Sequence, residues 1–194
     1  TSMPNGVADE FPANDTIVKN YFACQNVLAG TYTIDPMIPT GGANFKYFSD
    51  AIGTLSNCGI NGNTIFNIVP GTYDTLLSIP VIPGANSTAN VTFQSSTGNA
   101  NDVKIRNEAN SANNNYVFDL NGTKFFNIRN LSIQATNNNF ANCIKLRNNC
   151  KNILIENNIV SGVAANNVND DLNLINSNTN SSDTSIIIRN NILN

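Results

Sequence analysis

Acidic side chains gather at one place in this sequence. Asp170 and Asp171 are adjacent, and Asp183 follows in the same polar stretch. Two carboxyl groups held roughly 5–9.5 Å apart would suit hydrolysis of a glycosidic bond. Carboxylates that share a Ca²⁺ ion, with Arg189 as the base, would suit polysaccharide lyase chemistry. The stretch is rich in asparagine and typical of a solvated turn, so we assign no catalytic residue and keep Ca²⁺ binding by the three aspartates as an alternative.

Other side chains that carry chemistry are few or dispersed. The chain has no histidine, the commonest general base and zinc ligand. The remaining carboxylates of the repeated region occur singly, at Asp102, Glu108, Asp119 and Glu156. The four cysteines form no Cys-x-x-Cys pair, so a zinc site is not expected. The sequence therefore predicts no cofactor and, apart from the aspartates, no metal site.

The cysteines allow disulfides if the protein is extracellular. We favour a bridge between Cys24 and Cys58, which would tie an N-terminal arm to the segment that follows it. Cys143 and Cys150 flank one short strand, and their α-carbons are expected to lie beyond the roughly 7 Å that a disulfide permits. These two are predicted to be free thiols, with one or both buried.

The elements that must position these residues are short and repeated. From Tyr116 onward, two short apolar runs separated by polar turns recur three times, at intervals of about 26 to 33 residues. The first runs are 118–120, 144–146 and 172–174, and the second runs are 126–131, 153–159 and 186–192. Alternating apolar residues in short runs are typical of strands with one buried face. The repeat therefore predicts an all-β fold, a right-handed single-stranded parallel β-helix whose equivalent residues stack about 4.8 Å apart.

Alignment of the units predicts columns of stacked side chains. The inward column contains Ile128, Ile155 and Ile188. The turn column contains Asn130, Asn157 and Asn190. In that asparagine ladder, each side-chain amide would donate to and accept from its copies, and the backbone would adopt the left-handed angles that asparagine tolerates.

Charged residues form outward columns in the same alignment. One column contains Arg129, Glu156 and Arg189, and Asp119 is expected to stack on Lys145 in the same way. Opposite charges at this spacing attract weakly, by about 0.2–1 kcal/mol per pair. We interpret these residues as solvated charge ladders rather than catalytic groups.

The N-terminal part of the chain differs from the repeats. Residues 1–27 are polar and are predicted to form an extended arm, followed by one β-helix domain over 28–194 that continues beyond residue 194 in the native protein. Within it, an apolar helical face predicts a short helix over about 44–58, with Asn44 as N-cap and Gly59 at its end. Such a helix would cover the open end of the coil, where exposed strand edges invite aggregation.

Composition excludes several classes of protein. Charged residues make up 12% of the 194 residues and the net charge is −3. The basic residues are dispersed, which argues against nucleic-acid binding. No apolar run approaches the roughly 20 residues that cross a bilayer, so no transmembrane segment is expected. Asparagine makes up about one residue in five, which polar turns explain without any function.

Three stretches carry a resemblance to a known family: residues 30–34, 45–55 and 64–73. Together with residues 116–122 and 128–133, they resemble right-handed parallel β-helix domains of the pectin-lyase-like superfamily, in particular those of secreted and surface proteins of Bacteroidetes-type bacteria. The resemblance covers roughly residues 28–194. It implies a secreted or cell-surface location, often by type IX secretion through a C-terminal signal domain, and relatives that include adhesins and polysaccharide-processing enzymes.

The resemblance also implies O-glycosylation of Asp-Ser/Thr-aliphatic triplets. Two triplets match, which makes Thr16 and Thr75 candidate glycosylation sites. By contrast, the paired aspartates, arginine and glutamines of pectin methylesterases have no counterpart in this chain.

Two hypotheses of function remain open. The first is a non-catalytic extracellular β-helix module, such as a stalk, an adhesin or a polysaccharide-binding segment, whose partners are extracellular polysaccharide or components of the cell surface and the secretion system. The alternative is a fragment of a polysaccharide lyase or carbohydrate esterase. A fold hosts many functions, so the choice depends on the site.

Overall fold

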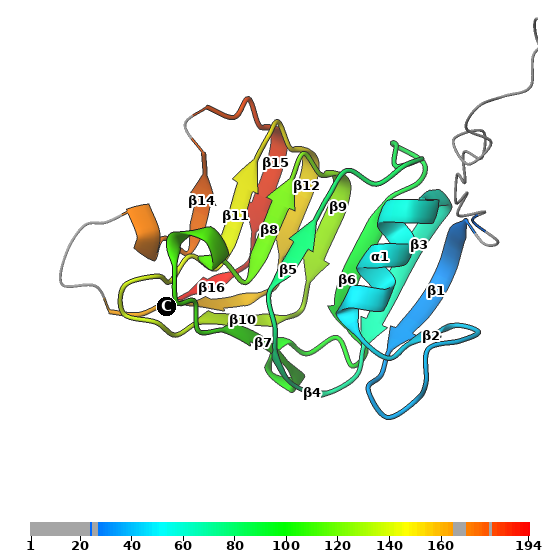
Figure 1. Ribbon diagram of the computed structural model, residues 1–194, viewed down its shortest axis with the longest axis horizontal. Coiled ribbons are helices and arrows are strands. Elements are labelled where there is room, and N and C mark those ends of the chain that lie inside the picture. Colours follow the sequence, from blue (N-terminus) through cyan, green and yellow to red (C-terminus); the bar gives the residue numbers. More distant parts are fainter. Residues whose placement is uncertain (1–23, 25–26, 165–169, 179) are drawn as a thin grey trace, which may run out of the picture.

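Parallel β-sheets make up most of the protein. The computed structural model describes residues 24, 27–164, 170–178 and 180–194, in which three parallel sheets accompany one α-helix. Figure 1 shows the strands of the largest sheet side by side, from β1 near one end of the molecule to β15 near the other. The fold is therefore all-β with little helix, as the repeat predicted.

The strands of each sheet follow one another in a regular order. The first sheet contains β15 (Thr184–Arg189), β12 (Lys151–Glu156), β9 (Lys124–Arg129), β6 (Val91–Ser95), β3 (Ile60–Ile68), β1 (Leu28–Ile34) and β2 (Asn44–Phe45). The second contains β16 (Ile192–Leu193), β13 (Ile159–Ser161), β10 (Ser132–Ala135), β7 (Val103–Asn107) and β4 (Gly71–Asp74). The third contains β14 (Ile175–Ser177), β11 (Ile144–Arg147), β8 (Phe118–Asn121) and β5 (Leu77–Ile79). From β3 onward the chain visits the first, second and third sheets in turn.

The predicted register of the first sheet is confirmed. Ile128 lies opposite Ile155, which lies opposite Ile188. The same column continues in the other direction through Phe93, Phe66 and Tyr32. In the third sheet the prediction was wrong by three residues, because the partner of Ile144 is Ile175 and not Leu172.

Asparagine ladders are present, but not in the predicted column. Asn130, Asn157 and Asn190 have positive φ angles of 53–56° and so form the turn, yet no hydrogen bond joins their side chains in the described part of the chain. The ladder lies one residue later. Asn158 Nδ2 donates to Ile128 O at 2.9 Å and to Asn191 Oδ1 at 3.1 Å. The left-handed residue turns the chain, so its successor is the one that points inward to the carbonyls of neighbouring strands.

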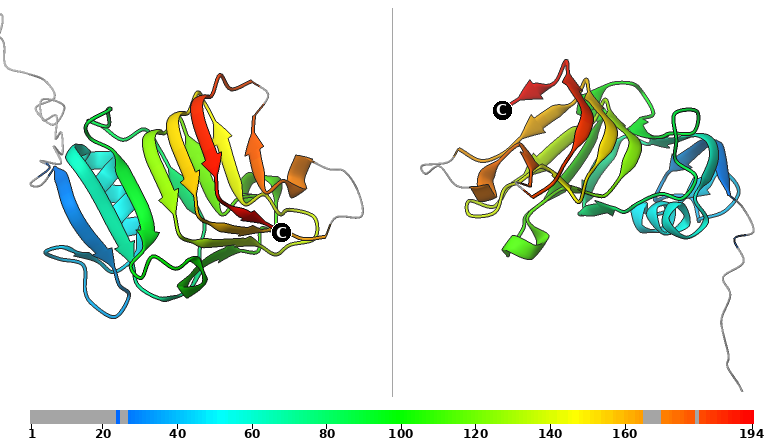
Figure 2. Two further views of the ribbon diagram at one scale, coloured as in Figure 1. Left: turned by 180° about the vertical axis from the view of Figure 1, so that it is seen from behind. Right: turned by 90° about the horizontal axis from the view of Figure 1, so that it is seen from above.

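The single helix of the described residues, α1 (Phe48–Cys58), buries Phe48, Ala51 and Leu55. It lies beside β1 and β3 at the N-terminal end of the first sheet (Figures 1 and 2). Gly59 ends it with φ 70°, and a Cβ there would lie 2.3 Å from the carbonyl oxygen of Pro83. Only glycine fits that close approach, as predicted.

The start of the helix was predicted wrongly. Its N-cap is Tyr47, whereas Asn44 belongs to β2. The Asn44 amide is 7% exposed and bonds to the loop before it, so it is not available as a cap. No helix among the described residues is long and apolar enough to span a membrane.

A disulfide joins the helix to the chain that precedes β1. Cys24 and Cys58 form the bridge that the sequence favoured, with their α-carbons 5.1 Å apart. Cys143 and Cys150 are free and buried. Burial raises the pKa of the Cys143 thiol to about 11 and raises the pKa of Cys150 as well. Since the thiolate is the reactive form, neither thiol is suited to nucleophilic chemistry.

Candidate ligand-binding pocket

The aspartates of the acidic stretch do not lie together as calcium ligands. Asp170 and Asp171 begin the 3-10 helix η5 (Asp170–Leu172) before β14, whereas Asp183 follows β14. Asp171 accepts a hydrogen bond of 3.1 Å from the Asn115 amide. Asp183 accepts instead from the Cys150 N–H at 2.7 Å and from two serine hydroxyls.

Asp171 and Asp183 thus lie at opposite ends of the third sheet. Asp171 neighbours the residues that precede β11, because the Ala141 N–H donates to its carbonyl at 2.7 Å, whereas Cys150 follows β11. Within the described residues, no three Cys, Asp or Glu side chains could hold a metal ion. The side chain of Asp170, and all of Thr16, lie outside the described part.

Arginines neutralise the carboxylates of Asp74, Asp119 and Glu156, and the last two are buried rather than solvated as predicted. Arg129 and Arg189 lie 2.8 and 2.7 Å from the two oxygens of Glu156, as the predicted charge ladder requires. Since Arg189 is paired with Glu156, it is not placed to act as the base of a lyase reaction at the three aspartates.

The predicted stacking of Asp119 on Lys145 is confirmed, but the carboxylate forms its ion pair with another residue. Lys145 is in register with Asp119, but the carboxylate accepts two hydrogen bonds of 2.7 Å from Arg147 instead. Ser78 adds a third hydrogen bond at 3.0 Å, and the Asp119 side chain is 1% exposed. Two parallel hydrogen bonds from a guanidinium are stronger than one from an ammonium group. The Asp119 carboxylate therefore pairs with Arg147 rather than with Lys145.

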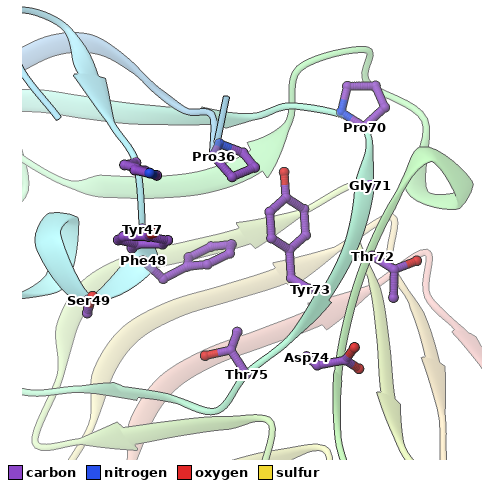
Figure 3. A pocket seen from close by; sticks show the side chains of 11 residues that line it. Pro36, Tyr47, Phe48, Ser49, Pro70, Gly71, Thr72, Tyr73, Asp74 and Thr75 are labelled. Atoms are coloured by element: carbon purple, nitrogen blue, oxygen red, sulfur yellow. The ribbon is translucent and has the colours of Figure 1, made fainter. Parts of the chain in front are cut away.

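A pocket lies between the start of α1 and strand β4. Its volume is about 460 Å³, within the range of small-molecule sites. It is lined by Pro36, Lys46, Tyr47, Phe48, Ser49, Pro70, Gly71, Thr72, Tyr73, Asp74 and Thr75. Figure 3 shows Tyr73 and Pro36 facing the Tyr47 and Phe48 rings across it.

The sequence places these side chains through two local features. Tyr47 precedes the helix in an extended conformation, with φ −128° and ψ 153°, so its side chain stays outside while Phe48 turns into the core. On the opposite wall, Tyr73 is at an inward position of β4, in register with buried Ile105. Because β4 is the edge strand of the second sheet, the Tyr73 ring stays half-buried.

The Tyr73 hydroxyl holds the wall of the pocket. It donates to Val69 O at 2.8 Å, and its ring meets Phe48 edge-on at 5.3 Å. Burial first, and then the carboxylate of Asp35, raise the pKa of Tyr73 to about 12. Tyr73 therefore stays protonated at neutral pH and is a structural side chain rather than an acid or base.

The rim of the pocket carries the remaining chemistry. Tyr47 is 53% exposed, and the Lys46 ammonium lies 5.3 Å from the centre of its ring in a cation–π contact. Asp74 forms an ion pair with Arg106, and the hydrogen bond from that guanidinium lowers the pKa of Asp74. Thr75, the candidate glycosylation site, is at the same rim. The pocket can thus accept apolar or ring-shaped groups, but it offers no free carboxylate for catalysis.

No sequence pattern points directly to this pocket. The apolar spacing of residues 45–55 predicts one helix, so it does not separate Tyr47 from the helical face. The one available signal is the pair of prolines around Met37 and Ile38, which marks an exposed turn with two large apolar side chains.

Comparisons of the chain with protein-family models, with curated proteins and with solved structures found no match. The role of the pocket and of the outer sheet faces must therefore be argued from their geometry.

Proposed function

We propose that residues 28–194 form a right-handed, single-stranded parallel β-helix that serves as a non-catalytic module of a larger secreted or cell-surface protein. The regular order of the three sheets, with each strand pairing in parallel with the strand of the next cycle, supports the coiled path. The resemblance to pectin-lyase-like surface proteins supports the extracellular location and type IX secretion. An adhesin, a stalk or a polysaccharide-binding segment fits this description.

The proposal rests on the ion pairs that three carboxylates form with arginines. Asp74, Asp119 and Glu156 each bind at least one arginine. A general acid must exchange a proton at working pH, and a glycosidase needs a pair of free carboxyl groups. Carboxylates that are held by guanidinium groups meet neither need, so binding is favoured over catalysis.

An amide row on the outer face of the first sheet suits an extended polysaccharide. Gln94 Nε2 donates to Asn67 Oδ1 at 2.9 Å, and Asn127 Nδ2 donates to Thr92 Oγ1 at 2.9 Å. The three amide side chains alternate with the buried ones of β3, β6 and β9, so they face outward. Asn67 and Gln94 keep amide N–H donors beyond these bonds, whereas Asn127 also donates to Asn90 Oδ1 at 3.1 Å and keeps only its acceptor oxygen. We propose that sugar hydroxyls bind across these three strands.

Binding to a panel of neutral and acidic polysaccharides, measured by affinity electrophoresis, tests this function. We expect retardation by at least one polymer, and about fivefold to tenfold weaker binding in Asn127→Ala and Gln94→Ala, since each loses one or two hydrogen bonds. Gln134→Ala, which removes an amide from β10 of the second sheet, outside both the amide row and the pocket, serves as the control. Depolymerisation of pectin or alginate that a chelator abolishes would instead support the lyase or esterase fragment.

A further inference from the structure

The loop between β1 and β2 exposes two large apolar side chains. Met37 is 87% exposed and Ile38 is 50% exposed. Apolar side chains of this size, held in solvent next to each other, are typical of an interaction site. No residue of the loop belongs to the amide row, so a role for the loop in association does not rest on the proposed polysaccharide binding.

The same loop is held rigid by one buried amide. Asn44 Nδ2 donates to the carbonyls of Asp35, Ile38 and Pro39, at 3.3, 2.9 and 3.3 Å. The side-chain oxygen Oδ1 of Asn44 accepts from the Thr33 hydroxyl at 2.6 Å. Because the loop is already ordered, a partner that binds Met37 would lose little conformational entropy.

The pocket adjoins this protrusion. Pro36 lines the pocket and is followed directly by Met37, while Tyr47 lines its other side and is itself exposed. Figure 3 shows Pro36 on the same side as Tyr73, opposite Tyr47, and Figure 1 shows the β1–β2 loop projecting beside the start of α1. The exposed Met37 and Ile38 side chains, which we call the knob, and the pocket with its aromatic rings therefore lie on one face.

We propose that a second copy of this chain docks on this face, with Met37 of each copy entering the pocket of the other. A two-fold contact requires a patch that is complementary to itself, and a knob beside a hollow meets that requirement. Methionine is flexible and its sulfur packs well against aromatic rings, which Tyr47, Phe48 and Tyr73 supply. The pocket volume of about 460 Å³ also leaves room for the Ile38 side chain to enter after Met37.

The charges around the contact are compatible with this pairing. Asp74 is neutralised by Arg106, and Lys46 is placed over the Tyr47 ring. Asp50 accepts a hydrogen bond from the Thr40 hydroxyl, and Asp35 accepts one from the Met37 N–H. The charges of this face that remain are Asp35 and Asp50 against Lys46, so in a two-fold contact the ammonium of one copy can face a carboxylate of the other.

Sedimentation of the 194-residue chain over a range of concentrations gives the first test. We expect a concentration-dependent dimer, and a dissociation constant about tenfold or more higher in Met37→Ser, which removes the knob. The matched control is Val81→Ser, since Val81 is 57% exposed but lies outside this face. A wild-type chain that is monomeric at every concentration, or an equal effect of both variants, would overturn the proposal.

A mixing experiment separates docking from misfolding. Met37→Lys and Tyr47→Asp should each abolish the dimer, since each places a charge in an apolar contact. In an equimolar mixture, the introduced ammonium of one copy faces the introduced carboxylate of the other, while the second contact of that pair remains wild type. We expect a mixed dimer; two variants that remain monomeric together, with unchanged circular dichroism, would refute the contact.

Discussion

The two ends of the strand stack differ in how their apolar residues are covered. At the N-terminal end, α1 and β2 pack against β1, and the Tyr32, Phe45 and Phe66 rings lie 5.6–5.7 Å from one another. At the C-terminal end, β15 and β16 expose apolar side chains by about half, at Ile187, Ile188, Ile192 and Leu193. Figure 2 shows the helix at one end of the stack and the red strands at the other.

One column of side chains runs between these ends and shows the cause. Ile128 and Ile155 are completely buried, whereas Ile188, the next member of the same column, is 47% exposed. All three are isoleucines, lie on the same side of their strands and are in register with one another. In a stacked repeat, each layer is covered by its neighbours. The burial of a residue therefore depends on whether a further layer covers it and not on its type.

The largest expected effect tests this difference within the column. Ile155→Ala should lower the free energy of unfolding by about 2–5 kcal/mol, because it removes buried carbons and leaves a cavity. Ile188→Ala, at the half-exposed position, should cost less than about 1 kcal/mol. Urea unfolding of both variants measures the gap.

The comparison would fail if both variants lost similar free energy. Equal losses would mean that Ile188 is covered in solution, for example by association at this end. Repeating the measurement at tenfold lower protein concentration distinguishes that case, since a loss that comes from association depends on concentration.

The second prediction concerns the covered end. Removal of the disulfide with Cys24→Ser and Cys58→Ser together should lower the unfolding free energy by about 2–4 kcal/mol, because the bridge closes a loop in the unfolded chain. Double replacement avoids an unpaired thiol that would complicate the result. Cys143→Ser, at a buried free thiol, is the control for cysteine replacement outside the bridge. A double variant with the wild-type midpoint would show that the N-terminal end is closed by packing alone.

Much of the fold could be predicted from the sequence because a repeat aligns with itself. The register of the first sheet and the Arg129–Glu156–Arg189 ladder follow from matched positions, whereas the disulfide was inferred from the arm that it would tie to the next segment. The start of α1 could not be predicted, because an asparagine such as Asn44 can either cap a helix or hold a loop by hydrogen bonds from its side chain. Propensity does not distinguish the two; the carbonyls of residues 35, 38 and 39, which only the folded loop brings together, decide it.

The pocket was less predictable than the fold for a related reason. It lies where the repeat does not apply, between a helix and the edge strand β4. A side chain there has no copy in another unit with which it can be aligned. The interpretation of Asp119 failed in the same way, since stacking identifies the neighbour directly above but not Arg147, which reaches the carboxylate from farther along β11.

The third prediction compares an interior member of the asparagine ladder with the member at the open end. Asn158 is 1% exposed and bonds to the layers on both sides. Asn158→Ala should therefore cost about 1–3 kcal/mol, since it leaves buried polar groups unpaired. Asn191→Ala, in the last layer, should cost less, because water can reach the groups that it exposes. Thermal unfolding measures both, and a larger loss at Asn191 would contradict the role of covering layers.

The smallest effect is expected at the covered end and depends on pH. The pKa of Tyr73 is about 12 in the folded protein and 10.0 for the ordinary side chain, so the fold favours the protonated phenol. This contribution to stability is complete below pH 10 and is lost as the pH rises through about 12. Tyr73→Phe cannot ionise, so its unfolding midpoint should fall less than that of the wild type between pH 10 and pH 12. Thr75→Val, at the same rim and without a titrating group, should follow the wild type; identical curves for all three proteins would show that water reaches the Tyr73 hydroxyl.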